Sequence, residues 1–427
     1  MERYAQMKNS GVGWIQDIPT GWGVRVLFQL ADQVKNKNKD LAEKNLLSLS
    51  YGKIKRKDIN NPEGLLPESF DGYNIIEAND IVLRLTDLQN DHTSLRVGQA
   101  KERGIITSAY TTIRPSAFVN PQYLYYVLHA YDLIKGFYGM GAGVRQGLNY
   151  DEVKAIKVPF PSVEEQRRIV AYLDDQVSQI DSIIEDEKAS IEEYKQWKAS
   201  AIFEAVTKGI KLNVTYKKSH DFRIGEIPAH WRMIKVKQVA KLNPSVETTG
   251  ITPEMEVTFA PMECIRTDKR IERIAPMSDN NSSYSSFNEG DIALAKVTPC
   301  FQNRNVCIMS DLKNGFAFGS SELFNIRPFN INARYLLYFF MTEAFKDGGV
   351  ANMTGVAGLQ RVSSAYVRNA ILPLPPEEEQ IQIVSFLDKQ CENIDELIAE
   401  KSTLVENLEM YKRSLIYESV TGKRKVV

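Results

Sequence analysis

The sequence predicts an α+β protein in which two small α+β domains are joined by two long helices that pair as a coiled coil, the whole being an internal repeat. Three observations predict this fold class. A proline break followed by a long amphipathic segment occurs twice, each copy carries apolar side chains at helical spacing, and short alternating β segments with one compact helix precede each copy. A chain of 427 residues has room for roughly two to four ordinary domains.

The repeated segment begins at a proline break in each half of the chain. VPFPSVEEQRRIVAYLD at 158–174 returns as LPLPPEEEQIQIVSFLD at 372–388. Residues 158–209 align with 372–423 without a gap, with 20 identities in 52 positions. Chance similarity between two acidic helices would not hold one register over that length, so the chain contains a duplication.

Shorter matches extend the duplication toward the N-terminal side of each long segment. DIPTGWGVRVLFQLA matches EIPAHWRMIKVKQVA, NDIVLRLTD at 79–87 matches GDIALAKVT at 290–298, and TIRPSAFVNPQYLYYVL at 112–128 matches NIRPFNINARYLLYFFM at 325–341. The residues between these matches differ freely. We therefore predict four parts: a variable domain at 1–157, a shared helix at 158–210, a second variable domain at 211–371, and a second shared helix with a C-terminal tail at 372–427.

Each shared segment is predicted to form one long helix with an apolar stripe. A capping box of Ser162 and Glu165 starts the first helix, Pro376 suits the first turn of the second, and no Pro or Gly interrupts either run before Gly209 and Gly422. About 45 residues at ~1.5 Å per residue give a rod of roughly 65–70 Å. Because such a rod cannot bury its own stripe, we expect each helix to pack on the other. The stripe residues expected at this contact are Ile169, Leu173, Ile180, Ile184, Ile191, Ile383, Leu387, Ile394, Ile398 and Leu408.

The two variable domains are predicted to be small α+β domains. In the first, NLLSLSYGKIKRKD, DIVLRLTD and GIITSAYTTIRP predict strands and PQYLYYVLHAYDLIKGFY predicts a compact helix, with ARYLLYFFMTEAFKD as its counterpart in the second. Each domain ends in a glycine-rich loop, GMGAGVRQG in the first and GGVANMTGVAGLQR in the second.

Charge is divided unevenly along the chain. The whole chain carries a net −1, but residues 162–208 carry −5 and residues 376–423 carry −6, which leaves the remainder at about +10. A basic excess outside the helices suits a polyanion such as nucleic acid. The alternative is a random scatter of charge over solvated surfaces.

Cysteine and histidine content argues against disulfides and metal sites. The four cysteines contain no CxxC pair and the chain has only four histidines. The N-terminus lacks the apolar segment of a signal peptide, and no run approaches the ~18 apolar residues of a membrane span. We expect a soluble protein of the reducing cytoplasm.

No catalytic or cofactor motif is recognisable. GMGAGVRQG does not complete GxGxxG and follows a helix instead of a strand, and no P-loop, HExxH or GxSxG occurs. The nearest approach to the (N/D)PP(Y/F) tetrapeptide of amino-methyltransferases is Asn120-Pro121-Gln122-Tyr123, which lacks the second proline and is better explained as a helix start. We expect neither catalysis nor a bound cofactor or metal.

The variable domains offer hydrogen-bonding side chains on permissive backbone instead. Arg and Gln can contact guanine and adenine edges through two bonds, and glycine lets the backbone approach phosphates. Basic residues of KIKRK are expected to contact phosphates or only solvent. The alternative is that each glycine loop merely turns the chain back toward the proline break. The candidate DNA-binding residues are Ser50, Tyr51, Lys53, Arg84, Thr86, Arg96, Gln99, Arg145, Gln146 and Asn149 in the first domain, and Lys296, Thr298, Gln302, Arg304, Gln360 and Arg361 in the second.

Several features together identify a family resemblance. They are PFPSVEEQRRIVAYLDDQ and PLPPEEEQIQIVSFLDKQ, the helix ends EAVTKG and ESVTGK, the IPxxW start of each half, and the variable domain between start and helix. This arrangement resembles the specificity subunit of type I restriction-modification systems over nearly the whole chain. The resemblance implies that the variable domains are target recognition domains and that the shared helices are conserved spacer regions.

The resemblance also implies a function and a set of partners. The helices would pair antiparallel, with pseudo-twofold symmetry, and hold the two domains so that the protein recognises a bipartite, asymmetric DNA site. The chain itself would be non-catalytic and bind no cofactor. Two modification subunits that bind S-adenosylmethionine and methylate adenine, and restriction subunits that use ATP and Mg to cleave DNA, would dock on it.

Two other functions remain open on the residues alone. A scaffold protein with two protein-binding modules would explain the duplication and leave the basic excess incidental. A nuclease or methyltransferase acting on DNA alone is the third reading, and the missing motifs count against it.

Overall fold

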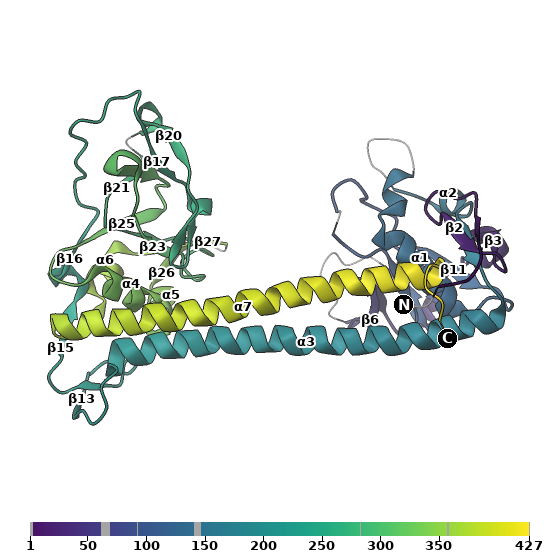
Figure 1. The fold of residues 1–427 in the computed structure, drawn as a ribbon, viewed down its shortest axis with the longest axis horizontal. Helices are drawn as coiled ribbons and strands as arrows, with labels where there is room; N and C mark the ends of the chain where they lie inside the picture. The colour runs from purple at the N-terminus through teal and green to yellow at the C-terminus, as the bar shows by residue number, and fades with distance from the viewer. Residues whose placement is uncertain are drawn as a thin grey trace. The chain divides into compact units, whose positions relative to one another are not determined.

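The chain forms two compact units. Unit 1 comprises 1–188 and 402–427, and unit 2 comprises 189–401. Two long helices, α3 (Val163–Lys208) and α7 (Glu377–Val420), each contribute one part to each unit (Figure 1). The computed structural model describes residues 3–60, 69–91, 93–140, 147–281, 283–356 and 358–426. Within these ranges, no helix is both long and apolar enough to cross a membrane.

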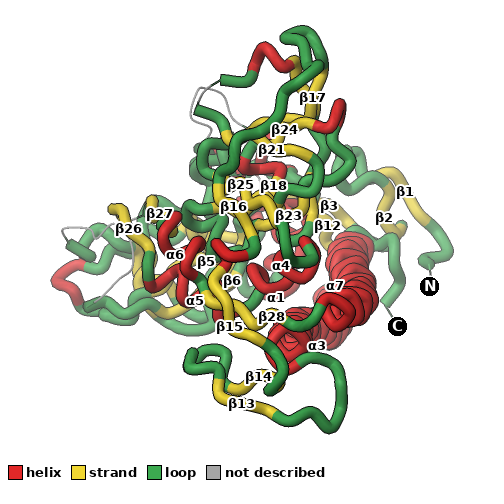
Figure 2. The backbone as a smooth tube through the Cα atoms, turned by 90° about the vertical axis from the view of Figure 1, so that its left-hand side faces the viewer, coloured by secondary structure: helices red, strands yellow, loops and turns green. Residues whose placement is uncertain are grey.

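Short strands and loops make up most of each variable domain (Figure 2). In unit 1 the strands and short helices are β1 (Met7–Asn9), β2 (Asp17–Pro19), β3 (Gly23–Val26), β4 (Ala31–Gln33), β5 (Leu47–Ser50), β6 (Lys53–Arg56), β7 (Asn74–Ile76), β8 (Ile81–Leu83), β9 (Val97–Gln99), β10 (Gly104–Ile106), β11 (Thr111–Pro115), α1 (Pro121–Leu133), α2 (Tyr150–Val153) and β12 (Lys157–Phe160).

The centre of unit 1 is an antiparallel sheet in the order β4-β11-β8-β9. Its side chains alternate between two faces. Ile81 and Leu83 join the apolar cluster that contains residues of α1, whereas Val82 joins a cluster with Leu47 and Leu49 of β5. A strand buried on both faces explains why DIVLRLTD has three consecutive apolar residues, Ile81, Val82 and Leu83.

In unit 2 the elements are β13 (Tyr216–Lys218), β14 (Glu226–Pro228), β15 (Arg232–Lys235), β16 (Ala240–Leu242), β17 (Glu256–Ala260), β18 (Ile265–Arg266), β19 (Lys269–Arg270), β20 (Ile274–Pro276), β21 (Ser285–Asn288), β22 (Ile292–Ala295), β23 (Val306–Ile308), β24 (Phe316–Gly319), β25 (Leu323–Pro328), α4 (Ala333–Met341), α5 (Glu343–Ala351), β26 (Met353–Val356), β27 (Leu359–Val362), α6 (Ser364–Asn369) and β28 (Ile371–Leu374).

Unit 2 repeats the central sheet of unit 1 and adds a second one. The strand order β16-β25-β22-β23 corresponds to β4-β11-β8-β9, and Ile292 pairs with Ile326 as Ile81 pairs with Ile113. The added sheet has the order β20-β17-β24-β21, with β17 and β24 parallel. The expectation of two small α+β domains is therefore confirmed in its mixed helix and strand content.

Two local expectations need correction. The segment ARYLLYFFMTEAFKD forms two helices instead of one, because Thr342 adopts an extended backbone and its hydroxyl caps α5 by accepting the Phe345 N–H at 3.3 Å. The glycine-rich segment after it is not a plain loop, since Gly348 and Gly349 lie in α5 and Gln360 lies in the β26–β27 hairpin.

A set of polar contacts joins the first variable domain to the start of α3. The buried Gln166 side chain donates from Nε2 to Pro161 O at 3.0 Å and accepts the Asn120 N–H at 2.9 Å. Glu165 accepts the indole N–H of Trp22 at 2.8 Å. These bonds satisfy backbone groups that would otherwise be buried without partners.

Tyr123 completes this set from inside α1. Its fully buried hydroxyl lies 3.2 Å from Pro159 O and 3.3 Å from Val420 O, the last residue of α7. The domain therefore contacts both long helices. We define helix anchor 1 as Trp22, Asn120, Tyr123, Glu165 and Gln166.

The same contacts recur in unit 2. Gln380 donates to Pro375 O at 2.9 Å and accepts the Asn332 N–H at 2.8 Å. Trp231 donates to Glu379 at 2.9 Å, and the Tyr335 hydroxyl lies 2.9 Å from Pro373 O and 3.0 Å from Val206 O. Helix anchor 2 is Trp231, Asn332, Tyr335, Glu379 and Gln380.

The anchors correct two details of the sequence comparison. Asn120 corresponds to Asn332, and Tyr123 corresponds to Tyr335. The alignment of α1 with α4 is therefore shifted by one residue relative to the ungapped match of 112–128 with 325–341. The loop between strand and helix is one residue shorter in unit 2. The capping box at Ser162 is half formed: Ser162 Oγ accepts the Glu165 N–H, but the Glu165 carboxylate accepts from Tyr4 and Trp22 instead.

Parts of α3 and α7 run antiparallel within each unit. In unit 1, Lys412 pairs with Asp181 and Lys188 pairs with Glu409 at 3.2 Å. In unit 2, Lys198 pairs with Asp395 at 2.8 Å. The Asp181–Lys412 and Asp395–Lys198 pairs occupy matching positions of the duplication.

The apolar stripe is largely buried, and part of it belongs to the domain cores. Ile169 and Leu173 lie in the same apolar cluster as residues of α1 and β8, so the stripe does not face only the other helix. Both helices end where expected, at Lys208 and Val420, just before Gly209 and Gly422 with positive φ. Buried stripe residues are Ile169, Leu173, Ile180, Ile184, Ile383, Leu387 and Ile394, while Ile191, Ile398 and Leu408 are partly exposed.

Replacing the anchor glutamine should destabilise unit 1. The change Gln166→Leu leaves Pro161 O and the Asn120 N–H buried without their partner, at a cost of roughly 2–4 kcal/mol. Urea unfolding of the full chain should show the loss. Gln179→Leu, the same change at an exposed position of α3, is the control. An equal effect of the two changes would contradict the anchor's role.

Candidate nucleic-acid interface

A tight hairpin presents the first group of candidate residues. Tyr51 and Gly52 form its two-residue turn, both with positive φ (46° and 75°), which fits the turn type that suits the twist of paired strands. Ser50 pairs with Lys53 across the turn. The Tyr51 side chain is 77% exposed and Lys53 is exposed, so the predicted residues of this hairpin do lie together at an accessible tip.

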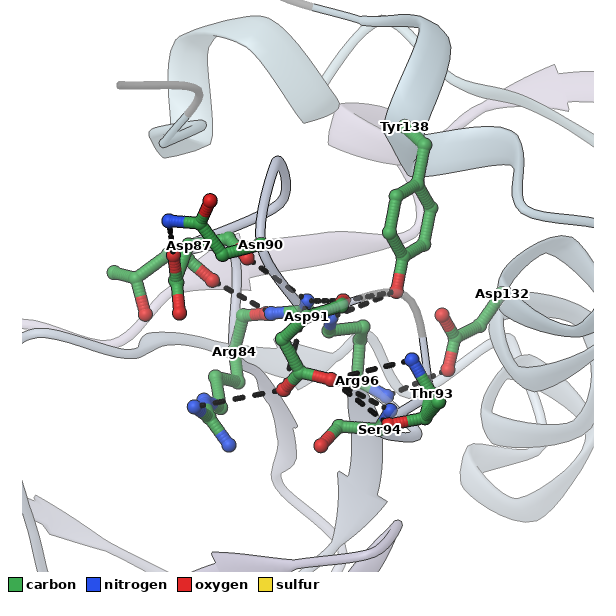
Figure 3. Close-up of polar contacts among 10 residues, drawn as sticks. Arg84, Asp87, Asn90, Asp91, Thr93, Ser94, Arg96, Asp132 and Tyr138 are labelled. Carbon is green, nitrogen blue, oxygen red and sulfur yellow. Dashed lines mark hydrogen bonds and ion pairs between the residues drawn. The ribbon is translucent and has the colours of Figure 1, made fainter. Parts of the chain in front are cut away.

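Arg96 is not an exposed candidate and must be corrected. Its side chain is fully buried, and its guanidinium donates to the backbone carbonyls of Thr86 at 2.6 Å and of Asp87 at 3.2 Å (Figure 3). It also bonds to the Asp91 carbonyl, and its Nε donates to the Tyr138 hydroxyl at 3.1 Å. The loop after β8 has carbonyls that no strand or helix satisfies, and Arg96 satisfies them.

Acidic residues around Arg96 have shifted pKa values that fit a structural role. Hydrogen bonds from the side chain and backbone of Ser94 hold the pKa of Asp91 well below its usual range. Burial raises the pKa of Asp132 to about 6, although the Arg96 N–H donates to its Oδ2 at 2.6 Å. Arg84, in contrast, is partly exposed and lies 3.7 Å from Asp91.

The remaining candidate DNA-binding residues of unit 1 differ in their exposure and in their hydrogen bonds. Thr86 is partly buried and contributes its carbonyl to Arg96. Asn149 is exposed but caps α2, because its side chain accepts the Asp151 N–H at 2.8 Å. Gln99 is partly buried at the end of β9, and its amide nitrogen has no hydrogen-bond partner among the described residues. Arg145 and Gln146 lie outside the described residues.

In unit 2 the structure brings four candidates together at the β26–β27 hairpin. The Thr298 hydroxyl accepts the Gln360 N–H at 3.0 Å, and the Val362 N–H donates to Lys296 O at 2.8 Å. Lys296 lies over the Phe324 ring, 5.3 Å from its centroid. The cluster is therefore Lys296, Thr298, Gln360 and Arg361.

The guanidinium of Arg361 is exposed but already engaged. It forms two 2.8 Å bonds with Glu322, which raise the pKa of Arg361 and lower the pKa of Glu322. A DNA contact by Arg361 would have to replace this pair. Gln302 is exposed, and Arg304 is paired with Glu343 of α5.

A second hairpin, which was not predicted from the sequence, corresponds in position to β5–β6. β18 and β19 flank the turn Thr267–Asp268, in which Asp268 has a φ of 58°, and exposed Arg266 and Lys269 pair across it. This hairpin contacts β23, the edge strand of the central sheet in unit 2. In unit 1, β6 contacts β9, which is the corresponding edge strand. We call β5–β6 and β18–β19 the edge hairpins. The pattern of a two-residue turn between polar residues and followed directly by a lysine, as in SYGK and RTDK, could have revealed both.

The described part of the chain holds no group of three or more His, Cys, Asp and Glu side chains that could bind a metal ion. The candidate residues instead provide hydrogen-bonding groups and positive charge. They are Tyr51, Lys53, Arg84, Gln302 and the cluster of Lys296, Thr298, Gln360 and Arg361. Such groups can bind phosphates and base edges.

The chain is similar to known proteins in sequence and in fold. A family model described as the type I restriction modification DNA specificity domain matches residues 19–193 and 279–407, more than half of the chain. The specificity subunit of the type I restriction enzyme EcoEI of Escherichia coli is 35% identical over 184 residues, which cover 42% of this chain and 31% of that protein. The match thus spans less than a third of that relative's length.

Two further comparisons extend over most of the chain. The MjaVIII specificity subunit of Methanocaldococcus jannaschii is 25% identical over 369 residues, covering 82% of this chain and 80% of that protein. A solved chain, from a structure concerning complex assembly and conformational transition of the type I R-M system, has a TM-score of 0.70 at 15% identity and covers 95% of this chain and 99% of that one. With the fold and the family match in agreement, the chain belongs to the family of type I restriction-modification DNA specificity subunits.

Proposed function

We propose that this chain is the specificity subunit of a type I restriction-modification complex and that its two variable domains recognise the two halves of a bipartite, asymmetric DNA site. The main support for the proposal is that the two helix anchors are alike while the accessible surfaces of the two variable domains are not. Helix anchors 1 and 2 make the same hydrogen bonds, whereas the accessible groups of the two domains differ.

The edge hairpins are the proposed reading elements. A two-stranded ribbon fits the major groove of B-DNA, and exposed cations next to it can contact phosphates. Tyr51 and Lys53 stand at the tip in unit 1, and Arg266 and Lys269 flank the tip in unit 2. Because these side chains differ, we infer that the two half-sites differ in sequence.

The long helices are the proposed spacer. Their antiparallel ion pairs at matching positions, Asp181–Lys412 and Asp395–Lys198, support an antiparallel coiled coil with pseudo-twofold symmetry. In this proposal the length of the helices sets the number of unspecified base pairs between the half-sites.

The exposed faces of the helices are the proposed docking surface for partners. Large apolar side chains stand exposed on them, including Trp197 at 52%, Ile381 at 54% and Phe386 at 40%. Aromatic and apolar groups of this kind favour a protein partner. Two modification subunits would bind there, and restriction subunits would join that assembly in the cytoplasm.

The chain is non-catalytic in this proposal. Adenine-N6 methylation with S-adenosylmethionine, and ATP- and Mg-dependent cleavage, are activities of the partner subunits. This chain contributes the position and sequence of the DNA on which they act.

A footprint tests the proposal. Full chain assembled with its modification subunits should protect one split DNA sequence at moderate salt, because two separate domains contact it. A chain with Tyr51→Ala and Lys53→Ala should lose protection over one half-site only. Assembly with the modification subunits and no sequence-specific protection would instead favour the scaffold function.

Arg84 and Arg96 should separate DNA binding from folding. Arg96→Met leaves several carbonyls unpaired and should cost about 3 kcal/mol or more in the free energy of unfolding. Arg84→Met should change that free energy by less than about 0.5 kcal/mol but weaken DNA binding and its salt dependence. Urea unfolding and fluorescence anisotropy of labelled DNA measure the two effects. Weakened DNA binding by a fully stable Arg96→Met chain would restore Arg96 to the interface.

A further inference from the structure

A cleft in unit 1 has no assigned use. It lies between edge hairpin β5–β6, helix α1 and the parts of α3 and α7 that belong to this unit, and it encloses about 420 Å³. A volume of this size accommodates a small organic ligand. Tyr125 of α1 forms part of an aromatic wall, stacked on His129 at a ring distance of 5.6 Å and an angle of 8°.

Two of the residues that line the cleft each carry a buried polar atom with no hydrogen-bond partner among the described residues. These atoms are the amide nitrogen of Gln99 and Nδ1 of His129, whose side chain is 8% exposed. Burial, together with nearby Lys412, lowers the pKa of His129 to about 4, so the ring is neutral at pH 7. A buried donor and a buried neutral imidazole are unfavourable when left unpaired, so each needs a water molecule or a ligand group as a partner.

The rim of the cleft is cationic. Lys53, Lys55 and Lys101 line it, and no ion pair to another described residue is found for any of the three. Arginines of the same domain differ, because Arg56 pairs with Glu102 and Arg103 with Glu43 and Glu77. The acid inside the cleft, Asp181, is neutralised by Lys412. The rim is therefore suited to an anion.

The corresponding elements in unit 2 are bridged by a side chain of the protein itself. Arg334 donates to Asp268 of edge hairpin β18–β19 and to Asp388 of α7, which ties hairpin, α4 and α7 together. The positions that match Tyr125 and His129 are the apolar Leu337 and Met341. Gln122 stands in place of Arg334, and its amide donates to Asp174 at 3.3 Å. The cleft's polar groups are thus not required by the shared fold.

We propose that this cleft binds a nucleotide, with its phosphate between the rim lysines and its base against Tyr125, Gln99 and His129. A bound nucleotide would join the edge hairpin to α1 in unit 1 as Arg334 joins the matching elements in unit 2. All residues of the site belong to unit 1, and a free nucleotide would occupy it whether or not the chain recognises DNA as proposed.

Calorimetric titration of the full chain with adenosine 5′-monophosphate tests the assignment. Binding should be saturable, and the change Lys55→Ala with Lys101→Ala should weaken it about tenfold or more, since each removes a charge-assisted contact. His129→Met, which introduces the residue of unit 2, should weaken binding while the chain keeps its unfolding midpoint. Lys269→Ala on the other edge hairpin is the matched control and should leave binding unchanged.

Competition experiments distinguish a free nucleotide from a nucleotide of a DNA strand as the ligand. If a short DNA duplex displaces the nucleotide, the cleft holds a nucleotide of the DNA strand; if it does not, the ligand is a free nucleotide, and either result supports the site. Equal affinity for inorganic phosphate would overturn the assignment of a base to the aromatic wall. No saturable binding, or binding indifferent to Lys55→Ala with Lys101→Ala and to His129→Met, would overturn the proposal.

Discussion

The need to satisfy buried backbone groups where a domain meets a long helix is the constraint on which this structure depends. Gln166 and Gln380 each satisfy a proline carbonyl and an asparagine N–H inside an apolar environment. Leaving such groups unpaired costs about 1–3 kcal/mol each, a substantial part of a domain's stability. The same five residue types therefore appear at the same places in both units.

This constraint divides the chain into constant and variable parts. Each anchor tyrosine also contacts the end of the other long helix, so each variable domain is bonded to both helices. Outside the anchors and the central sheet, the units diverge. Unit 2 has an additional sheet, and Arg334 bonds to its edge hairpin, whereas unit 1 has a cleft with cationic residues at the matching elements. Divergence of this kind allows two different surfaces on one repeated framework.

Sequence reasoning located the framework well because the framework is what the two halves share. The identity of Trp22 with Trp231 and of Gln166 with Gln380 marked the anchors, although their hydrogen bonds were not foreseeable. The variable surfaces were harder to predict. Arg96 is a charged residue between Leu95 and Val97 and was expected to be exposed, but its guanidinium is buried because it donates to the carbonyls of the loop after β8. Thr342 breaks a helix that apolar periodicity alone would continue, and the second edge hairpin carries too few residues to show a strand pattern.

We propose that the helices set the spacing between the two half-sites and that the variable domains set the base sequence of each half-site. The most direct test is to map methylated sequences in cells whose complex carries a chain shortened by one heptad in both helices, within 183–196 of α3 and the matching 397–410 of α7. Removing about 10 Å of helix should shorten the spacer by roughly 3 base pairs and leave both half-sites unchanged. Altered half-site letters with an unchanged spacer would contradict the account.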